Sequence, residues 1–191
     1  VANAAAAGAV YDVTVAGDLT VGTGGVNLTT ATGDTLLTTT GASTNDILLN
    51  AGVGNTTGNT TLTSAGVISG AATVFANDLR LDAFNSIGGS GAPVFTNTTG
   101  NVAARLTNPT ATGRIVIHEI SAGSGLTVGT ANGLSGVATT NDREIELEAS
   151  SGNIVINQQV NSGSGAITLT TSSSGDVVIA LNGEVYNFRE L

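Results

Sequence analysis

Short runs of alternating apolar and small polar residues recur along this chain, and this repetition limits the fold more than any other feature. Four such runs follow one another in the last third: EIELEA, NIVIN, AITLT and DVVIA, all within residues 144–180. Alternation with a period of two is the pattern of a β-strand with one buried face. Clusters of Gly, Asn and Ser separate the runs, and no helical spacing appears between them. We therefore expect an all-β protein.

The similar runs recur at a nearly constant offset. In the last third, the apolar positions of one run match those of a later run. The matched residues are Ile145, Leu147, Ile154 and Ile156 with Ile167, Leu169, Val177 and Ile179. A repeat of about 20 residues is typical of a solenoid, in which each turn of the chain stacks on the one before. We expect all eight side chains to be buried in ladders, while the outward residues need only be soluble.

The first third gives a similar offset. The pattern matches Val26 and Leu28 with Ile47 and Leu49, and Val15 with Leu36, at the same spacing in each case. The middle of the chain is less regular, so residues 84–101 and 129–142 are predicted to be loops or enlarged corners. The prediction is a β-solenoid of roughly 20–23 residues per coil. A β-sandwich subunit that polymerises by strand exchange, as pilins do, is the alternative fold.

Composition agrees with a narrow, layered core. The chain has 191 residues, of which 27 are Gly and 30 are Thr, while Trp, Met and Cys are absent and only 3% are aromatic. The core must therefore consist of Val, Ile, Leu and Ala. Thr favours strands, and Gly favours frequent tight turns.

The charge pattern excludes several functions. All five basic residues are Arg, and fourteen acidic residues give a net charge of −9. Such a chain cannot form the basic surface that nucleic acids or anionic membranes require. No apolar run is long enough to span a bilayer, so membrane insertion is not expected. The absence of Cys excludes disulfides, thiolate catalysis and cysteine–zinc sites.

The segments GDLTV, NDILLNAG, NDLRLDA, SGNIVINQQVNSGSGAITLTT and GDVVIA resemble the repeats of filamentous-haemagglutinin-like adhesins and giant bacterial surface proteins. The resemblance covers most of the chain and is weakest over residues 85–112. It implies a right-handed parallel β-helix on the cell surface, used for adhesion, spacing or fibre formation. It implies no catalytic residue. We treat residues 1–191 as one solenoid domain, or a segment of a longer one, with a small-residue segment over 1–10 and a terminal strand over 184–191.

Two groups of residues invite a catalytic hypothesis. His118 is the only histidine and Glu119 lies beside it, but neighbouring strand residues point to opposite faces. Asp78, Arg80 and Asp82 would share one side of a strand, and β-helix enzymes that cleave polysaccharides use paired carboxylates. A solvated face with a local ion pair is the simpler interpretation of these three residues.

A third group is acidic. Glu144, Glu146 and Glu148 form the densest acidic face, which is a solvated surface or, as a second hypothesis, a weak calcium site between subunits. No calcium-binding loop motif is present, and no other cofactor is expected.

The sequence thus predicts an extracellular, non-enzymatic structural protein: a segment or subunit of a surface adhesin or fibre. The alternative is a carbohydrate-active β-helix enzyme or a carbohydrate-binding module. Expected partners are other copies in an end-to-end fibre or flanking repeats of the same chain, with a surface carbohydrate or host receptor as ligand. An assembly interface is predicted at the C-terminal end, where aromatic and arginine side chains gather. Its residues are Val185, Tyr186, Phe188 and Arg189.

Overall fold

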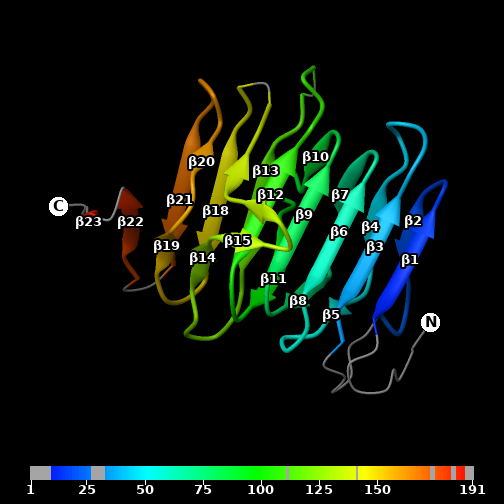
Figure 1. Cartoon of the computed structure of the whole chain (residues 1–191), viewed down its shortest axis with the longest axis horizontal. Coiled ribbons are helices and arrows are strands. Elements are labelled where there is room, and N and C mark those ends of the chain that lie inside the picture. The colour runs from blue at the N-terminus through cyan, green and yellow to red at the C-terminus, as the bar shows by residue number, and fades with distance from the viewer. Residues whose placement is uncertain are drawn as a thin grey trace.

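The chain coils into a parallel β-solenoid of about seven turns, which lie side by side along the long axis of the molecule (Figure 1). The structure is a computed structural model that describes residues 10–26, 33–110, 112–140, 142–172, 175–181 and 184–187. No helix occurs in these residues, which confirms the all-β prediction. Strands of successive turns pair in parallel, so the sandwich alternative is wrong.

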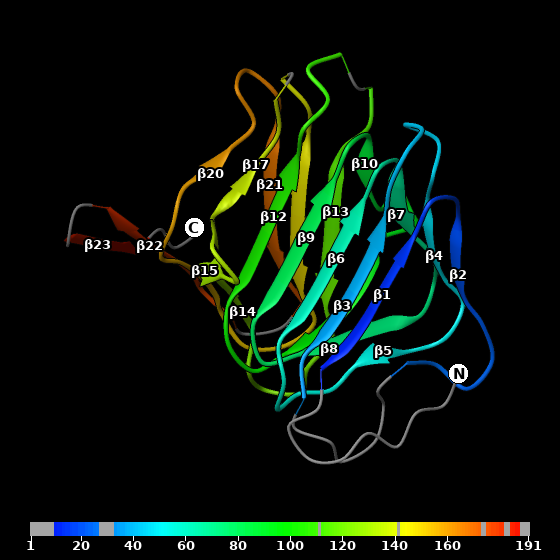
Figure 2. The same ribbon diagram turned by 45° about the vertical axis from the view of Figure 1, so that its right-hand side comes forward.

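Two large sheets form the walls of the solenoid, and most strands of sheet A lie in front in Figure 2. Sheet A contains β1 (Tyr11–Val15), β3 (Thr35–Thr39), β6 (Thr60–Ser64), β9 (Leu79–Ala83), β12 (Val102–Leu106), β14 (Leu126–Val128), β17 (Val137–Ala138), β19 (Ile154–Ile156), β20 (Val160–Asn161), β22 (Val177–Leu181) and β23 (Glu184–Asn187). Sheet B contains β2 (Leu19–Val21), β4 (Ile47–Leu49), β5 (Val53–Gly54), β7 (Val67–Ser69), β8 (Thr73–Ala76), β10 (Ser86–Ile87), β11 (Val94–Thr98), β13 (Ile115–Glu119), β18 (Ile145–Ala149) and β21 (Ile167–Thr171). A separate hairpin pairs β15 (Thr130–Ala131) with β16 (Leu134–Ser135).

The core consists of aliphatic ladders between the two sheets, as the composition predicts. In the last third the predicted registers are confirmed, because Ile145 and Leu147 pair with Ile167 and Leu169. The strand β19 likewise pairs with β22 in the predicted register.

The prediction that all eight ladder residues are buried is wrong for the last turn. Ile145 is fully buried, whereas its partner Ile167 is 44% exposed. Leu169, Val177 and Ile179 are only partly buried. For Ile167 and Leu169 the reason is position in the stack, because β21 has a neighbouring strand, β18, on one side only.

The predicted registers of the first third are wrong. Ile47 and Leu49 stack on Leu19 and Val21 rather than on Val26 and Leu28. Val26 forms a bridge with Val53 instead, and Leu28 lies outside the described residues. Similarly, Leu36 faces Asp12, and Val15 faces Thr39. The cause is uneven coil length, which the spacing of paired residues shows: Tyr11 with Thr35, Thr60 with Leu79, and Val128 with Ile156.

The two segments predicted to be loops are partly strands. Residues 84–101 contain β10 and β11, which both stack on β13 at Ile115 and Ile117. Residues 129–142 contain the β15–β16 hairpin and β17. The hairpin interrupts one strand of sheet A, because β12 pairs with β14 at Val102 and with β17 at Ala104.

Candidate functional site

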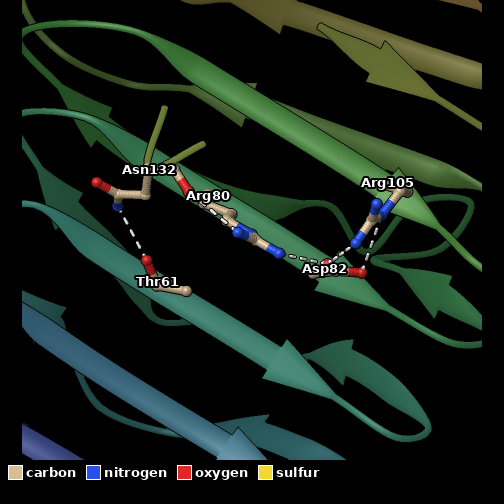
Figure 3. Close-up of polar contacts among 5 residues, drawn as sticks. All are labelled: Thr61, Arg80, Asp82, Arg105 and Asn132. Carbon is tan, nitrogen blue, oxygen red and sulfur yellow. Dashed lines mark hydrogen bonds and ion pairs between the residues drawn. The ribbon is translucent and has the colours of Figure 1, made fainter. Parts of the chain in front are cut away.

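An arginine–aspartate cluster lies on the outer face of sheet A (Figure 3). The Asp82 carboxylate on β9 accepts a hydrogen bond from Nη2 of Arg80 at 2.9 Å and a second, short one from Nη2 of Arg105. Arg105 is the register partner of Asp82 on β12, so parallel stacking brings the two side chains together. The aspartate is largely shielded, with 9% of its side chain exposed, against 26% for Arg80 and 42% for Arg105.

The β15–β16 hairpin covers one side of this cluster. Nη1 of Arg80 donates to the backbone oxygen of Asn132 at 3.0 Å, and Nδ2 of Asn132 donates to Oγ1 of Thr61 on β6 at 2.9 Å. Asn132 and Gly133 both have positive φ, 47° and 79°, as a two-residue hairpin turn requires. The outward-facing Ala103 is fully buried, which fits a hairpin that lies on β12.

Asp78 lies outside this cluster, contrary to the expectation that it would share one face with Arg80 and Asp82. It precedes β9, at the corner of the coil, and its Oδ1 accepts the backbone N–H of Asn101 at 2.7 Å and Nδ2 of the same residue at 3.2 Å. The two carboxylates therefore hold different partners, and each has a structural role.

The corner bond of Asp78 is one step of a ladder. Oδ1 of Asp34 accepts the N–H of Asn59 at 2.9 Å, and Oδ1 of Asn59 accepts the N–H of Asp78 at 3.2 Å. Each side chain thus binds the backbone of the equivalent residue one turn later. Acid and amide alternate from Asp34 to Asn101, so carboxylates do not stack directly on each other, an arrangement that would be unfavourable. The sequence analysis missed this ladder, although the Asn and Asp residues before each strand were its signal.

A second corner uses the same device. Oδ1 of Asp18 accepts the N–H of Asp46 at 3.0 Å, and Oδ1 of Asp46 accepts the N–H of Val67 at 2.7 Å. In the later turns, Oδ1 of Asp142 accepts the N–H of Ser164 at 2.7 Å. Several of the fourteen acidic residues therefore link successive turns through hydrogen bonds from backbone N–H groups to their carboxylates.

Two of the three predicted acidic residues lie on β18 and Glu144 lies just before it, and each of the three has a different neighbour. Glu144 forms an ion pair with Arg114 at 2.5 Å. Glu148 accepts a hydrogen bond from Oγ of Ser172 at 2.9 Å, and Glu146 is stacked against Thr168. Within the described ranges, no three His, Asp or Glu side chains are grouped as metal ligands would be. Calcium binding between subunits stays a prediction.

His118 and Glu119 point to opposite faces, as expected for neighbouring strand residues. Ser150 Oγ and Glu148 Oε1 approach the same ring nitrogen of His118, Nε2, at 2.7 and 3.6 Å. In a catalytic triad the hydroxyl and the carboxylate contact opposite ring nitrogens, so this arrangement lacks the geometry of a proton relay.

Glu119 is fully buried between β11 and the corner that follows β13. Its carboxylate accepts the hydroxyls of Thr96 and Thr98 at 2.8 and 2.7 Å. It also accepts the N–H groups of Thr98 and Ser121 at 3.1 and 2.9 Å. All four donors come from the chain itself, which gives Glu119 a structural role.

The predicted assembly interface falls partly on β23. Val185 and Tyr186 pair with Ala180 and Ile179 of β22 in an antiparallel register. Phe188 and Arg189 lie outside the described residues. The antiparallel strand interrupts the parallel pairing of sheet A at this edge.

No protein-family model matches the chain, and neither a curated protein nor a solved structure matches it. Within the part of the chain that the structure describes, no helix has the length and apolar character needed to cross a membrane.

Proposed function

We propose that this chain is an extracellular, non-enzymatic structural segment of a cell-surface adhesin or fibre, and that its coils stack end to end with a neighbouring solenoid. The neighbour is a second copy or a flanking repeat of the same chain. The observation that carries the proposal is the difference between Ile145, which is fully buried, and its ladder partner Ile167, which is 44% exposed.

The first turn has the same feature. Tyr11, Val13 and Leu19 point inward but are only partly buried. They line a hollow of about 240 Å³ together with Val21 and Val26. A neighbouring coil that covers the aliphatic surface at either end would stabilise the contact by about 25 cal/mol for each Å² removed from water.

The open strand edges favour the same contact. Among the described strands, β21 has one neighbour, β18, and β2 has one neighbour, β4. Unpaired edges of this kind are templates for another strand. Since β23 occupies the outer edge of β22, sheet B is the wall that offers a free edge at the C-terminal end.

The non-enzymatic part of the proposal is supported by the bonds of three carboxylates, each of which is occupied by groups of the chain itself. The carboxylates of Asp78 and Glu119 bind backbone N–H groups, and Asp82 is neutralised by two arginines. The adhesive and extracellular parts are supported by the resemblance of the repeats to surface adhesins.

Light scattering and electron microscopy of the purified chain test the proposal. We expect rods longer than one solenoid, and we expect Ile167→Glu to disperse them because a charge would enter the contact. Ile120→Glu is the matched control, since Ile120 is 38% exposed but lies in the middle of the stack. Removal of residues 184–191 tests the predicted C-terminal interface separately. Strictly monomeric particles of the unmodified chain, with both terminal coils covered by that chain itself, would contradict the proposal.

A further inference from the structure

Two phenylalanines on sheet B point away from the core. The described aliphatic core contains no Phe, although aromatic side chains normally contribute most to a core. On β8 the buried residues are Val74 and Ala76, and Phe75 between them is half-buried on the outer face. On β11 Phe95 likewise lies on the outer face, between the buried Val94 and Thr96. In a chain with only six aromatic residues, two of them on one outer face make this face a candidate contact surface.

The two rings begin a continuous strip across the outer face of sheet B. Phe95 faces His118 on β13, and their ring centroids are 5.4 Å apart at an angle of 39°. Phe75 faces Asn97, two residues after Phe95, so the two phenyl rings are diagonal neighbours. His118 in turn faces Glu148.

Thr170 follows Glu148 in the same row. We call the set the aromatic strip. Its members are Phe75, Phe95, Asn97, His118, Glu148 and Thr170. It crosses five neighbouring strands, which corresponds to about 19 Å at a strand spacing of about 4.8 Å.

The polar half of the strip is held in place and still accessible. His118 is fixed by Ser150 at 2.7 Å, and Glu148 is fixed by Ser172 at 2.9 Å. The side chains of His118 and Glu148 remain 21% and 31% exposed. The strip therefore offers fixed hydrogen-bonding groups beside two aromatic rings on the outer face of sheet B.

We propose that the aromatic strip binds a neutral oligosaccharide. The negative face of a phenyl ring attracts the positively polarised C–H groups of a sugar ring. The hydroxyl, amide, imidazole and carboxylate groups nearby can exchange hydrogen bonds with sugar hydroxyls. Glu148 and the neighbouring Glu146, in a chain of net charge −9, repel sulfated or uronate sugars. This inference deepens the adhesive part of the proposed function and rests on it.

Isothermal titration calorimetry with the full chain tests the inference. The probes are neutral gluco-, galacto- and manno-oligosaccharides and their sulfated counterparts. We expect saturable binding of at least one neutral oligosaccharide and weaker binding of its sulfated form. Phe75→Thr and Phe95→Thr should each weaken binding by about tenfold, the loss expected from removal of one aromatic contact. Phe95→Tyr keeps the ring and should retain binding.

Leu48→Thr is the matched control, because Leu48 is an outward apolar residue of sheet B, 39% exposed, that lies away from the strip. It should bind like the unmodified chain. The inference is overturned if no neutral oligosaccharide binds, if the sulfated forms bind more tightly, or if the Phe75→Thr/Phe95→Thr variant binds unchanged. Self-association that this double variant abolishes would show that the strip contacts a second copy instead. End-to-end rods should persist in the double variant, so failure of stacking and failure of sugar binding are distinguishable.

Discussion

At the scale of single residues, Glu119 illustrates how this solenoid tolerates a carboxylate in its interior. An isolated buried charge is very unfavourable, and it is retained only where hydrogen bonds replace water. Here four donors from Thr96, Thr98 and Ser121 surround the carboxylate. Oε1 accepts both N–H groups and Oε2 accepts both hydroxyls, and the N–H of Thr98 also reaches Oε2 at 3.2 Å.

This geometry predicts different effects for two substitutions. Glu119→Leu should lower the free energy of unfolding by about 3 kcal/mol or more, because two buried N–H groups lose their acceptor. Glu119→Gln should cost much less, since its oxygen can keep both N–H groups while the hydroxyls reverse to accept from its amide. Urea denaturation measures both, with the half-exposed Glu146→Leu as a control expected to stay within about 0.5 kcal/mol of the parent. Equal losses for Leu and Gln would show that the charge itself is required.

At the scale of elements, the β15–β16 hairpin is an insertion that folds back over earlier turns. Its turn reaches Arg80 on β9 and Thr61 on β6, which precede Asn132 by 52 and 71 residues. The hairpin therefore connects three turns of sheet A and orients Arg80 toward Asp82. Its conformation depends on the positive φ of Asn132 and Gly133.

Gly133→Ala tests this dependence without a steric clash. A Cβ at Gly133 would meet no atom within 4 Å, but the φ of 79° is strained for alanine by about 1 kcal/mol. Gly89→Ala is the control, because Gly89 has the same open space and no positive φ. We expect faster amide hydrogen exchange over residues 130–135 for Gly133→Ala only. Unchanged exchange would mean that packing on β12, rather than the turn, holds the hairpin.

At the scale of the whole molecule, stability depends on the position of a residue along the stack. Each turn contacts chiefly its two neighbours, as in other repeat proteins, so a terminal turn loses half of its contacts. The pair Ile145 and Ile167 isolates this effect, because the two residues occupy the same ladder.

Ile145→Ala should destabilise the protein by about 3 kcal/mol, as expected for a cavity in a fully buried position. Ile167→Ala should cost about 1 kcal/mol or less, because 44% of this residue is already in water. Thermal and urea denaturation at low protein concentration measure both. If the cost of Ile167→Ala rises with protein concentration, the terminal rung is covered by another copy, as the proposed function requires.

The sequence by itself determined that the chain coils, which residues of the last third face inward, and how those residues stack. It did so because alternation assigns the two faces of a strand, and Ile, Leu and Val appear at similar offsets where coil lengths are nearly equal. Only the tertiary structure decided the registers of the first third, where corners of different length shift Leu19, not Val26, onto Ile47. It also added Arg105 and Asn132 to the predicted ion pair of Arg80 with Asp82, and it assembled the aromatic strip. Both arise between residues such as Arg80 and Asn132, or Phe95 and His118, which lie far apart in the chain. Stacking brings such residues together. Which residues stack depends on how many residues each corner takes up, and the strand patterns alone do not show this.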